Sequence, residues 1–188
     1  MVDESAQRGA MVALTCESEF GAARDEFEAY LHRLTHHVLV RRPTSVECLA
    51  GQDGIGGGPT VEAAQRNFSE SIGESVGLTR MACFSAPRGF VWTYQTPDHH
   101  AAVMFSMATA TPREEARDFM LGLAGQVLQE RSWGLVATER GLEERFDPFD
   151  LVDRPWQRDP SSSVQSVLEE SLGEGSVVEA FACFRIGP

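Results

Sequence analysis

Two segments of the chain resemble each other: TVEAAQRNFSESIGESVGLTRMACF at residues 60–84 and SVQSVLEESLGEGSVVEAFACF at residues 163–184. Both begin with a hydroxyl residue followed by valine, contain Gly-Glu, and end in Ala-Cys-Phe. The interval from Gly-Glu to Ala-Cys-Phe is the same in the two segments. This likeness indicates one structural unit used twice, a helix followed by a strand.

A second pair of matching segments lies upstream. Apolar residues recur with the spacing of one face of a helix in each half of the chain, because residues three and four apart share a face. The two sets keep the same offsets: Phe27, Tyr30, Leu31, Leu34 and Val38, then Ala116, Phe119, Met120, Leu123 and Val127. Two pairs in the same order predict a duplicated architecture, with a first subdomain over residues 1–86 and a second over residues 87–188.

Each half is predicted to contain strands and helices in a similar order. In the first half we expect a strand over 10–16, helices over 23–40 and 61–72, and a strand over 78–84. The glycine-rich stretch 51–59 lacks the Lys-Ser or Lys-Thr of a phosphate loop, so it is interpreted as a flexible linker.

The second half is predicted to open with a hairpin over 90–94 and 101–107. Thr111, Pro112 and Glu114 form the pattern of a helix start, with Thr111 as the cap, and this helix is expected to reach about Arg131. A last helix is expected to start at Ser162, and a strand over 177–186 closes the half. The predicted fold class is α+β, with two repeated subdomains, each a small antiparallel sheet packed with helices.

Composition limits the kinds of ligand that the protein can bind. The 188 residues carry a formal net charge of −12, and the chain contains no lysine. An acidic surface repels phosphate backbones and anionic lipids, so we expect no direct nucleic-acid binding and no membrane binding. Without lysine there is no P-loop lysine and no Schiff base. The amino terminus has acidic residues where a signal peptide is basic, and a cytoplasmic location is predicted.

Catalytic and metal-binding patterns are weak. The cysteines Cys16, Cys48, Cys83 and Cys183 form no C-x-x-C pair, and we expect them to be buried, reduced thiols. No cysteine has a neighbouring histidine in sequence that would mark it as a nucleophile, and no covalent enzyme chemistry, catalytic residue or cofactor is predicted. His32 and His36 have the i,i+4 spacing of zinc ligands beside His37, but no third ligand is evident. A solvated helix face is the main interpretation, and a metal-binding or small-molecule protein stays as an alternative.

Several segments, in consistent order over nearly the whole chain, resemble the elongation factor Ts family. TCESEFGAARDEF at 15–27 is similar to the family signature Asn-Cys-Glu-Thr-Asp-Phe-Val-Ala and the helix after it. IGESVGLTR at 72–80 resembles Ile-Gly-Glu-Asn-Ile and a following arginine. Further similar segments are TYQ at 93–95, RPWQRDPSSSVQSVL at 154–168 and AFACFRIG at 180–187.

The resemblance implies a bacterial translation factor that binds elongation factor Tu and makes this GTPase release GDP. The Asp-Phe pair of the family signature is understood to reach the GTPase near its magnesium and phosphate site. These two positions fall on Glu19 and Phe20, so the implied partner contact comprises Ser18, Glu19, Phe20 and Gly21. The implied mechanism requires Phe20 to be exposed at the end of a strand.

The chain departs from the family pattern at several places. Glu19 stands where the family has aspartate, Gly21 where it prefers valine, and Thr96 and Pro97 follow Gln95 where a histidine is usual. We also expect no room for the family's amino-terminal helical domain before residue 10, for its helical hairpin between Trp133 and Trp156, or for a carboxy-terminal helix before Pro188. These departures leave open a second hypothesis, an exchange-deficient paralogue that acts as a protein-binding module, and a homodimer also stays open.

Overall fold

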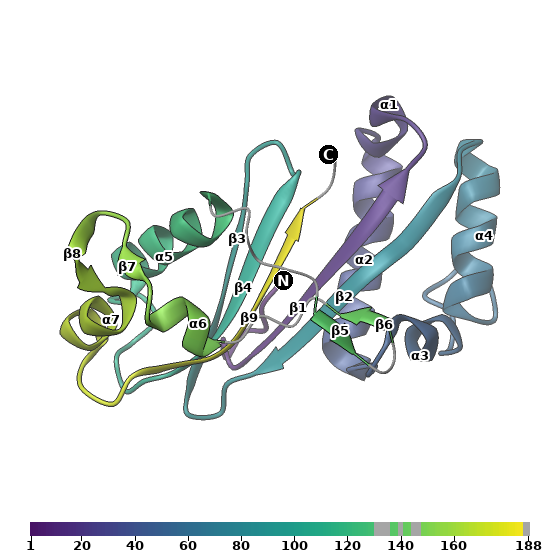
Figure 1. Ribbon diagram of the computed structural model, residues 1–188. Helices are drawn as coiled ribbons and strands as arrows, with labels where there is room; N and C mark the ends of the chain where they lie inside the picture. Colours follow the sequence, from purple (N-terminus) through teal and green to yellow (C-terminus); the bar gives the residue numbers. More distant parts are fainter. Residues whose placement is uncertain (130–135, 139–140, 144–147, 186–188) are drawn as a thin grey trace. The chain divides into compact units, whose positions relative to one another are not determined.

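The computed structural model of the chain describes residues 1–129, 136–138, 141–143 and 148–185. It is a mixed fold of small antiparallel sheets and helices (Figure 1). The chain divides into two compact units, one of Met1 with residues 10–83 and one of residues 2–9 with 84–188. Residues 2–9 thus group with the second unit. The predicted boundary at 86/87 and the internal duplication stay predictions.

The first unit contains a two-stranded sheet and four helices. β1 (Arg8–Cys16) pairs with β2 (Val76–Ser85). The helices are α1 (Glu19–Ala22), α2 (Asp25–Arg41), α3 (Val46–Ala50) and α4 (Val61–Ile72). The predicted helix over 23–40 is therefore α2, with the separate short α1 before it.

The apolar stripe of α2 forms the core of this unit, as its spacing predicts. Phe27, Tyr30, Leu34 and Val38 are buried, whereas Leu31 is only half-buried. These residues pack with Ala10, Leu14, Leu39, Leu49, Val61 and Val76 from the surrounding elements. Tyr30 also stacks on Phe68 of α4, with ring centroids 4.3 Å apart.

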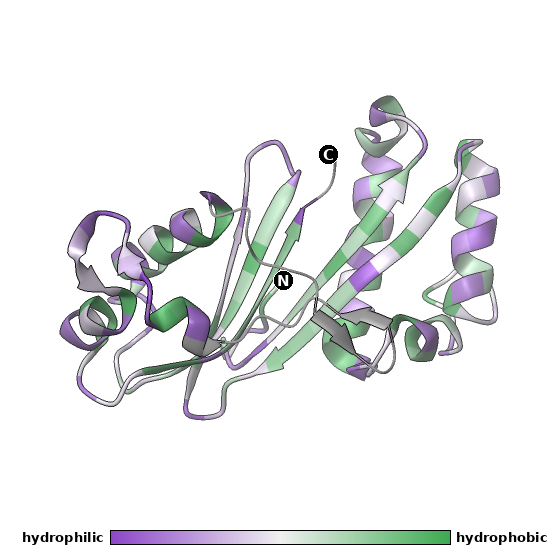
Figure 2. Ribbon diagram, viewed as in Figure 1, coloured by the Kyte–Doolittle hydropathy of each residue, from purple (hydrophilic) through white to green (hydrophobic). Residues whose placement is uncertain are grey.

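The second unit is built on a three-stranded antiparallel sheet in the order β3 (Gly89–Gln95), β4 (Ala101–Ala108), β9 (Val177–Arg185). The predicted hairpin is β3 and β4, paired from Gly89 with Ala108 to Gln95 with Ala102. Its other elements are α5 (Arg117–Gln129), β5 (Val136–Thr138), β6 (Gly141–Glu143), α6 (Pro148–Val152), β7 (Pro155–Trp156), β8 (Asp159–Ser163) and α7 (Val164–Leu172). The whole predicted stripe of α5 is buried against this sheet, and Figure 2 shows β4 as hydrophobic over most of its length.

The predicted start of α5 is wrong. This helix begins at Arg117, six residues after Thr111, and the Thr111 hydroxyl donates to the carbonyl of Leu172 at 2.6 Å. The last helix is capped by Ser163, whose hydroxyl accepts from the Ser166 amide. This cap lies one residue after the predicted Ser162. Arg131 and Ile186, the predicted ends of a helix and a strand, and Trp133 and Pro188 lie outside the described residues.

The glycine-rich stretch is a closed loop within the first unit. The Gly54 amide donates to the Pro59 carbonyl at 3.1 Å, and the Val61 amide donates to the Gln52 carbonyl at 3.0 Å. Asn67 of α4 also donates to the Gly57 carbonyl. The loop is therefore held at its base and on one side, rather than being a free linker.

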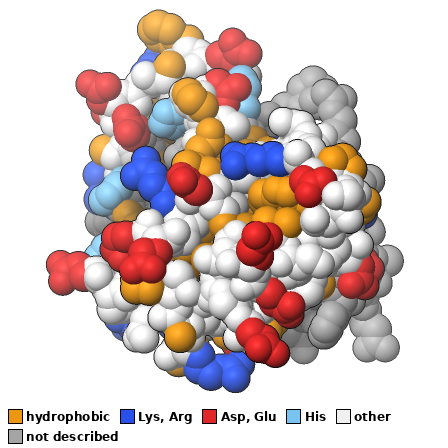
Figure 3. All heavy atoms as spheres, turned by 90° about the vertical axis from the view of Figure 1, so that its left-hand side faces the viewer, with side chains coloured by type: hydrophobic (Ala, Val, Ile, Leu, Met, Phe, Trp, Pro, Cys, Tyr) orange, Lys and Arg blue, Asp and Glu red, His pale blue; other side chains and the backbone are white. Residues whose placement is uncertain are grey.

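The cysteine expectation holds only in part. Cys183 is buried and Cys16 and Cys83 are half-buried, but Cys48 is exposed, because α3 turns Leu49 inward instead. None of these four cysteines, all of which lie within the described residues, forms a disulfide. Acidic side chains are scattered over the face drawn in Figure 3, in keeping with the net charge of −12. Among the described residues, no helix combines the length and apolar character needed to cross a bilayer.

Candidate partner-binding site

The four implied contact residues lie together in the short turn of chain that follows β1. Ser18 caps α1: its backbone is extended, and its hydroxyl accepts from the Gly21 amide at 2.9 Å. Serine is a favoured residue at this position because its side chain satisfies an amide that has no partner within the helix. Glu19 and Phe20 are exposed and Gly21 is buried, so α1 presents one side to solvent and the other to the protein.

Phe20 is the most exposed of the large apolar residues in the described part of the chain. Its side chain is 75% exposed, against 58% for Val40 and 46% for Val177. Burying a phenylalanine is worth about 1.5–3 kcal/mol, so this ring forgoes that gain in the isolated chain. The predicted exposure is confirmed, but the position is not a strand end, since Phe20 lies within α1.

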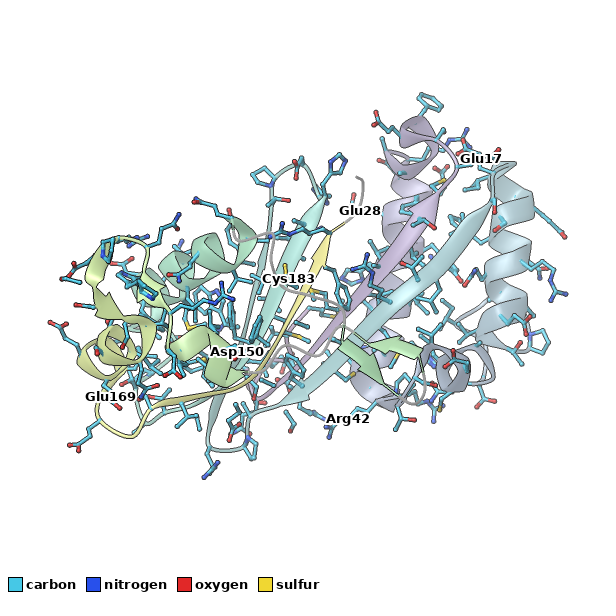
Figure 4. The ribbon with its side chains drawn as sticks, viewed as in Figure 1. Glu17, Glu28, Arg42, Asp150, Glu169 and Cys183 are labelled. Carbon is cyan, nitrogen blue, oxygen red and sulfur yellow. The ribbon has the colours of Figure 1, made fainter. Side chains whose placement is uncertain are left out.

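Glu74, in the turn between α4 and β2, braces this segment. Its carboxylate accepts from the Ser18 amide at 3.0 Å, the Ser18 hydroxyl at 2.8 Å and the Cys16 thiol at 3.2 Å. The Ser18 hydroxyl, followed by the Cys16 thiol, holds the pKa of Glu74 below its ordinary value of 4.5. A further contact between the same two segments joins the Ser75 amide to Glu17, which Figure 4 labels beside this turn.

Gly21 is the residue that lets Glu74 approach. A Cβ at this position would lie 2.5 Å from the carboxyl carbon of Glu74 and 2.6 Å from its Oε1, below the 3.0 Å that real contacts reach. The Glu74 carboxylate therefore occupies the volume that a side chain at residue 21 would take. The resemblance implies valine at residue 21. In this chain the Glu74 carboxylate fills the space that the valine side chain would take.

Arg24 connects the exposed ring to the brace. Its guanidinium carbon lies 5.4 Å from the centre of the Phe20 ring, within the range of a cation–π contact. Its Nη1 donates to the Ile72 carbonyl at 3.1 Å, and its Nη2 lies 4.0 Å from Glu74 Oε1. Phe20 is thus exposed on a segment that is fixed from two sides.

Sequence reasoning missed Glu74 and Arg24. The signal for Glu74 was present, because Gly73-Glu74 is the dipeptide repeated at Gly173-Glu174 and lies in the segment IGESVGLTR. Nothing in the sequence indicates that this glutamate contacts Ser18, 56 residues away.

The histidine alternative gains no third ligand. His32 and His36 are exposed on α2, and a ring nitrogen of His37 hydrogen-bonds Gln52 at 2.9 Å. Within residues 1–129 and the later described segments, no group of three or more His, Cys, Asp or Glu side chains is close enough to hold a metal ion.

A family model described as elongation factor TS matches residues 17–127, which include Ser18, Phe20, Gly21 and Glu74. The chain belongs to the elongation factor Ts family. This is a family of translation elongation factors, so a role in protein biosynthesis follows from membership.

Relatives named elongation factor Ts match nearly the whole chain at low identity. The protein of Streptomyces griseus is 24% identical over 217 residues, covering 100% of this chain and 77% of the relative. That of Chlorobaculum tepidum is 28% identical over 224 residues, covering 100% and 77%. That of Clostridium perfringens is 28% identical over 221 residues, covering 99% and 73%. At these identities the names of the relatives do not establish the activity of this chain, which depends on the geometry of its own site.

Proposed function

We propose that this chain is a guanine-nucleotide exchange factor for elongation factor Tu, and that it acts through binding alone, without covalent chemistry. The observation that carries the proposal is Phe20, 75% exposed within the family signature and held on a braced segment. Ser18, Glu19, Phe20 and Gly21 form the contact. Ser18 and Gly21 shape α1, while Glu19 and Phe20 reach the partner.

The mechanism is displacement of the groups that hold GDP. A GTPase binds the phosphates through backbone amides and an octahedral magnesium, which tolerates little misplacement of its ligands. Insertion of the Phe20 ring beside that site shifts these groups, and burial of the ring contributes about 1.5–3 kcal/mol to holding the shifted state. The Glu19 carboxylate adds repulsion toward the phosphates of the departing GDP.

The brace supports this mechanism by reducing the entropy lost on binding. A residue that is already fixed loses less conformational freedom when it docks, so more of its burial energy appears as affinity. Glu74 and Arg24 supply this restraint for the backbone of Ser18 and for the Phe20 ring. If this chain lowers the affinity of the GTPase for nucleotide by some factor, then bound nucleotide lowers the affinity of the GTPase for this chain by the same factor.

The test is release of a fluorescent GDP analogue from elongation factor Tu, followed by stopped flow. Wild-type protein at micromolar concentration is expected to accelerate release, and Phe20→Ala to remove most of the acceleration while the circular dichroism spectrum stays unchanged. Val177→Ala, which trims another exposed apolar side chain, serves as the matched control and is expected to keep full activity. Absence of acceleration by the wild-type protein would refute the proposal.

A second candidate is a protein-binding module that docks on the GTPase without driving exchange. The observation that favours it is Glu19, whose side chain is one methylene longer than the aspartate of the family signature and which is exposed beside Phe20. Calorimetry that finds tight binding together with unchanged GDP release would select this candidate. In that case Glu19→Asp is expected to raise the release rate. The expectations of a cytoplasmic location, of no direct nucleic-acid binding and of a homodimer stay predictions.

A further inference from the structure

A groove of about 490 Å³ lies along the carboxy-terminal turns of α2, and Ile55 of the glycine-rich loop also lines it. Its polar lining consists of His32, Arg33, His36, His37 and Arg41, and its apolar lining of Val40 and Ile55. All seven residues belong to the first unit. None of the seven is among residues 18–21, so the groove is separate from the proposed exchange site.

The lining of the groove is cationic in an acidic protein. It holds two arginines and three imidazoles, which can donate hydrogen bonds, and none of the described residues that line it is a carboxylate, although the chain has a net charge of −12. These cationic groups attract a ligand that brings negative charge to this one place, whereas the chain as a whole, with its net charge of −12, repels it.

The two arginines are held apart from each other. Arg33 points back over the ring of Tyr30, with its guanidinium carbon 5.9 Å from the ring centre, while Arg41 pairs with Asp53 at 3.8 Å. Eight residues of helix separate them, a rise of about 12 Å. A single phosphate cannot span that separation, whereas about four residues of extended peptide can, at roughly 3.3 Å each. The spacing therefore favours an extended ligand with several separated anions.

The groove is formed before any ligand arrives. His37 hydrogen-bonds the Gln52 side chain at 2.9 Å, and the Gln52 carbonyl accepts from the Val61 amide at 3.0 Å, so the loop is tied both to α2 and to the start of α4. Val40 is 58% exposed, which leaves an apolar surface beside the cations. Asp53 is 91% exposed, and such a solvated ion pair is weak, so an incoming carboxylate can replace Asp53 on Arg41.

We propose that this groove is a docking site for an extended acidic peptide segment of a protein partner. The segment carries carboxylates spaced to meet Arg33 and Arg41, with an aliphatic side chain between them to cover Val40 and Ile55. The imidazoles of His32 and His36 supply further donors along the same face of α2. This function is independent of the proposed nucleotide exchange.

The test is fluorescence anisotropy of a labelled peptide in which glutamate and leucine alternate. The intact chain is titrated into this peptide in the absence of any GTPase. We expect saturable binding that weakens as salt rises. The double variant Arg33→Ala, Arg41→Ala is expected to bind about tenfold more weakly, since two exposed charge pairs are lost. Arg66→Ala is the matched control, because Arg66 is an exposed arginine of the same unit that pairs with Glu62 on α4, and it is expected to change nothing.

Val40→Ser tests the apolar contact and is expected to weaken binding by a smaller factor, with no effect on folding, as Val40 lies on the surface. A peptide with lysine in place of glutamate is expected not to bind. The proposal is overturned by no binding at millimolar peptide, by equal binding to the double arginine variant, or by equally tight binding of a single-stranded RNA oligonucleotide or of inorganic phosphate. The GDP-release assay is unaffected by any of these outcomes, so the two proposals fail separately.

Discussion

Gly21→Ala is a small change with an unusual expected sign. In the interior of a helix, alanine normally stabilises a protein by about 0.5–1 kcal/mol relative to glycine, because glycine loses more conformational freedom on folding. At residue 21 the added Cβ meets the Glu74 carboxylate, with the carboxyl carbon at 2.5 Å and Oε1 at 2.6 Å. Either the carboxylate moves and gives up its bonds to Ser18 and Cys16, or α1 moves away from it.

The magnitude follows from these two opposing effects. Inserting a methyl group into a filled space costs about 1–3 kcal/mol. Subtraction of the helix preference of alanine leaves a net destabilisation of about 0.5–2 kcal/mol. Gly125→Ala provides the matched control: Gly125 lies in α5 and a Cβ there meets nothing within 4 Å, so this substitution is expected to stabilise.

The measurement is urea unfolding of the two single variants, followed by far-ultraviolet circular dichroism. Tryptophan fluorescence is a second probe that reports the other unit, because Trp92 and Trp156 both lie in the second unit and no tryptophan lies in the first. Gly21→Ala is expected to lower the circular dichroism transition and leave the fluorescence transition in place.

The close approach of Glu74 to Gly21 is tested most directly in a Glu74→Ala background. With the carboxylate removed, the methyl group added at residue 21 has room, and the effect of Gly21→Ala is expected to change sign and become stabilising. If Gly21→Ala stabilises the wild-type protein as Gly125→Ala does, or if its cost is the same with and without Glu74, then the close approach of Glu74 to Gly21 is refuted.

Three further outcomes are expected. The pKa of Glu74 is lowered by its bonds to Ser18 and Cys16, so its stabilising contribution is complete above pH 4.5 and is lost as the pH falls through the lowered pKa. The free energy of unfolding should therefore differ between wild type and Glu74→Gln by a constant amount above pH 4.5, and by less below it. Leu34→Ala removes a fully buried side chain of α2 and should cost about 2–5 kcal/mol in urea unfolding, whereas Val40→Ala, on the exposed face of the same helix, should stay within about 0.5 kcal/mol of wild type. Ser163→Ala should cost about 0.5–2 kcal/mol, because it removes the cap of α7, and Ser162→Ala should cost much less. Thermal unfolding that finds Ser162→Ala the less stable variant would instead support a cap at Ser162.

The parts of the fold that the sequence predicted well are those with local signals. The stripes of α2 and α5 arise from helical periodicity, and the hairpin from two apolar runs joined by a turn that contains Pro97 and Asp98. α4 occupies the predicted residues, with Thr60 as its cap. Short elements have no such signal. α3 has five residues and only one buried apolar side chain, so its pattern cannot be told from a turn.

The failed cap at Thr111 shows why local rules are overridden. Thr111, Pro112 and Glu114 fit a helix start, but the Leu172 carbonyl, 61 residues away, accepts the Thr111 hydroxyl. That acceptor lies at the end of α7, where carbonyls lack helical partners. Residues 111–114 contain no sign of this distant partner of Thr111, so the later start of α5 could be found only with the tertiary structure.

The candidate site divides in the same way. The resemblance located Phe20, because the signature is contiguous in sequence, and its exposure follows from α1 turning Gly21 inward. The brace could not be predicted, since Glu74 reaches Ser18 and Cys16 across 56 and 58 residues of chain.

The brace also changes the meaning of the departure at Gly21. From sequence alone, glycine in place of the family's valine indicates a degraded contact. In the structure the missing volume is filled by the Glu74 carboxylate, which in turn holds the amide and hydroxyl of Ser18, the cap of α1. Gly21 and Glu74 therefore act as a pair, and restoring valine alone at residue 21 should displace the carboxylate, free the Phe20 segment and lower exchange activity. A Gly21→Val variant that releases GDP faster than wild type, with Ser18 still bonded to Glu74, would contradict this pairing.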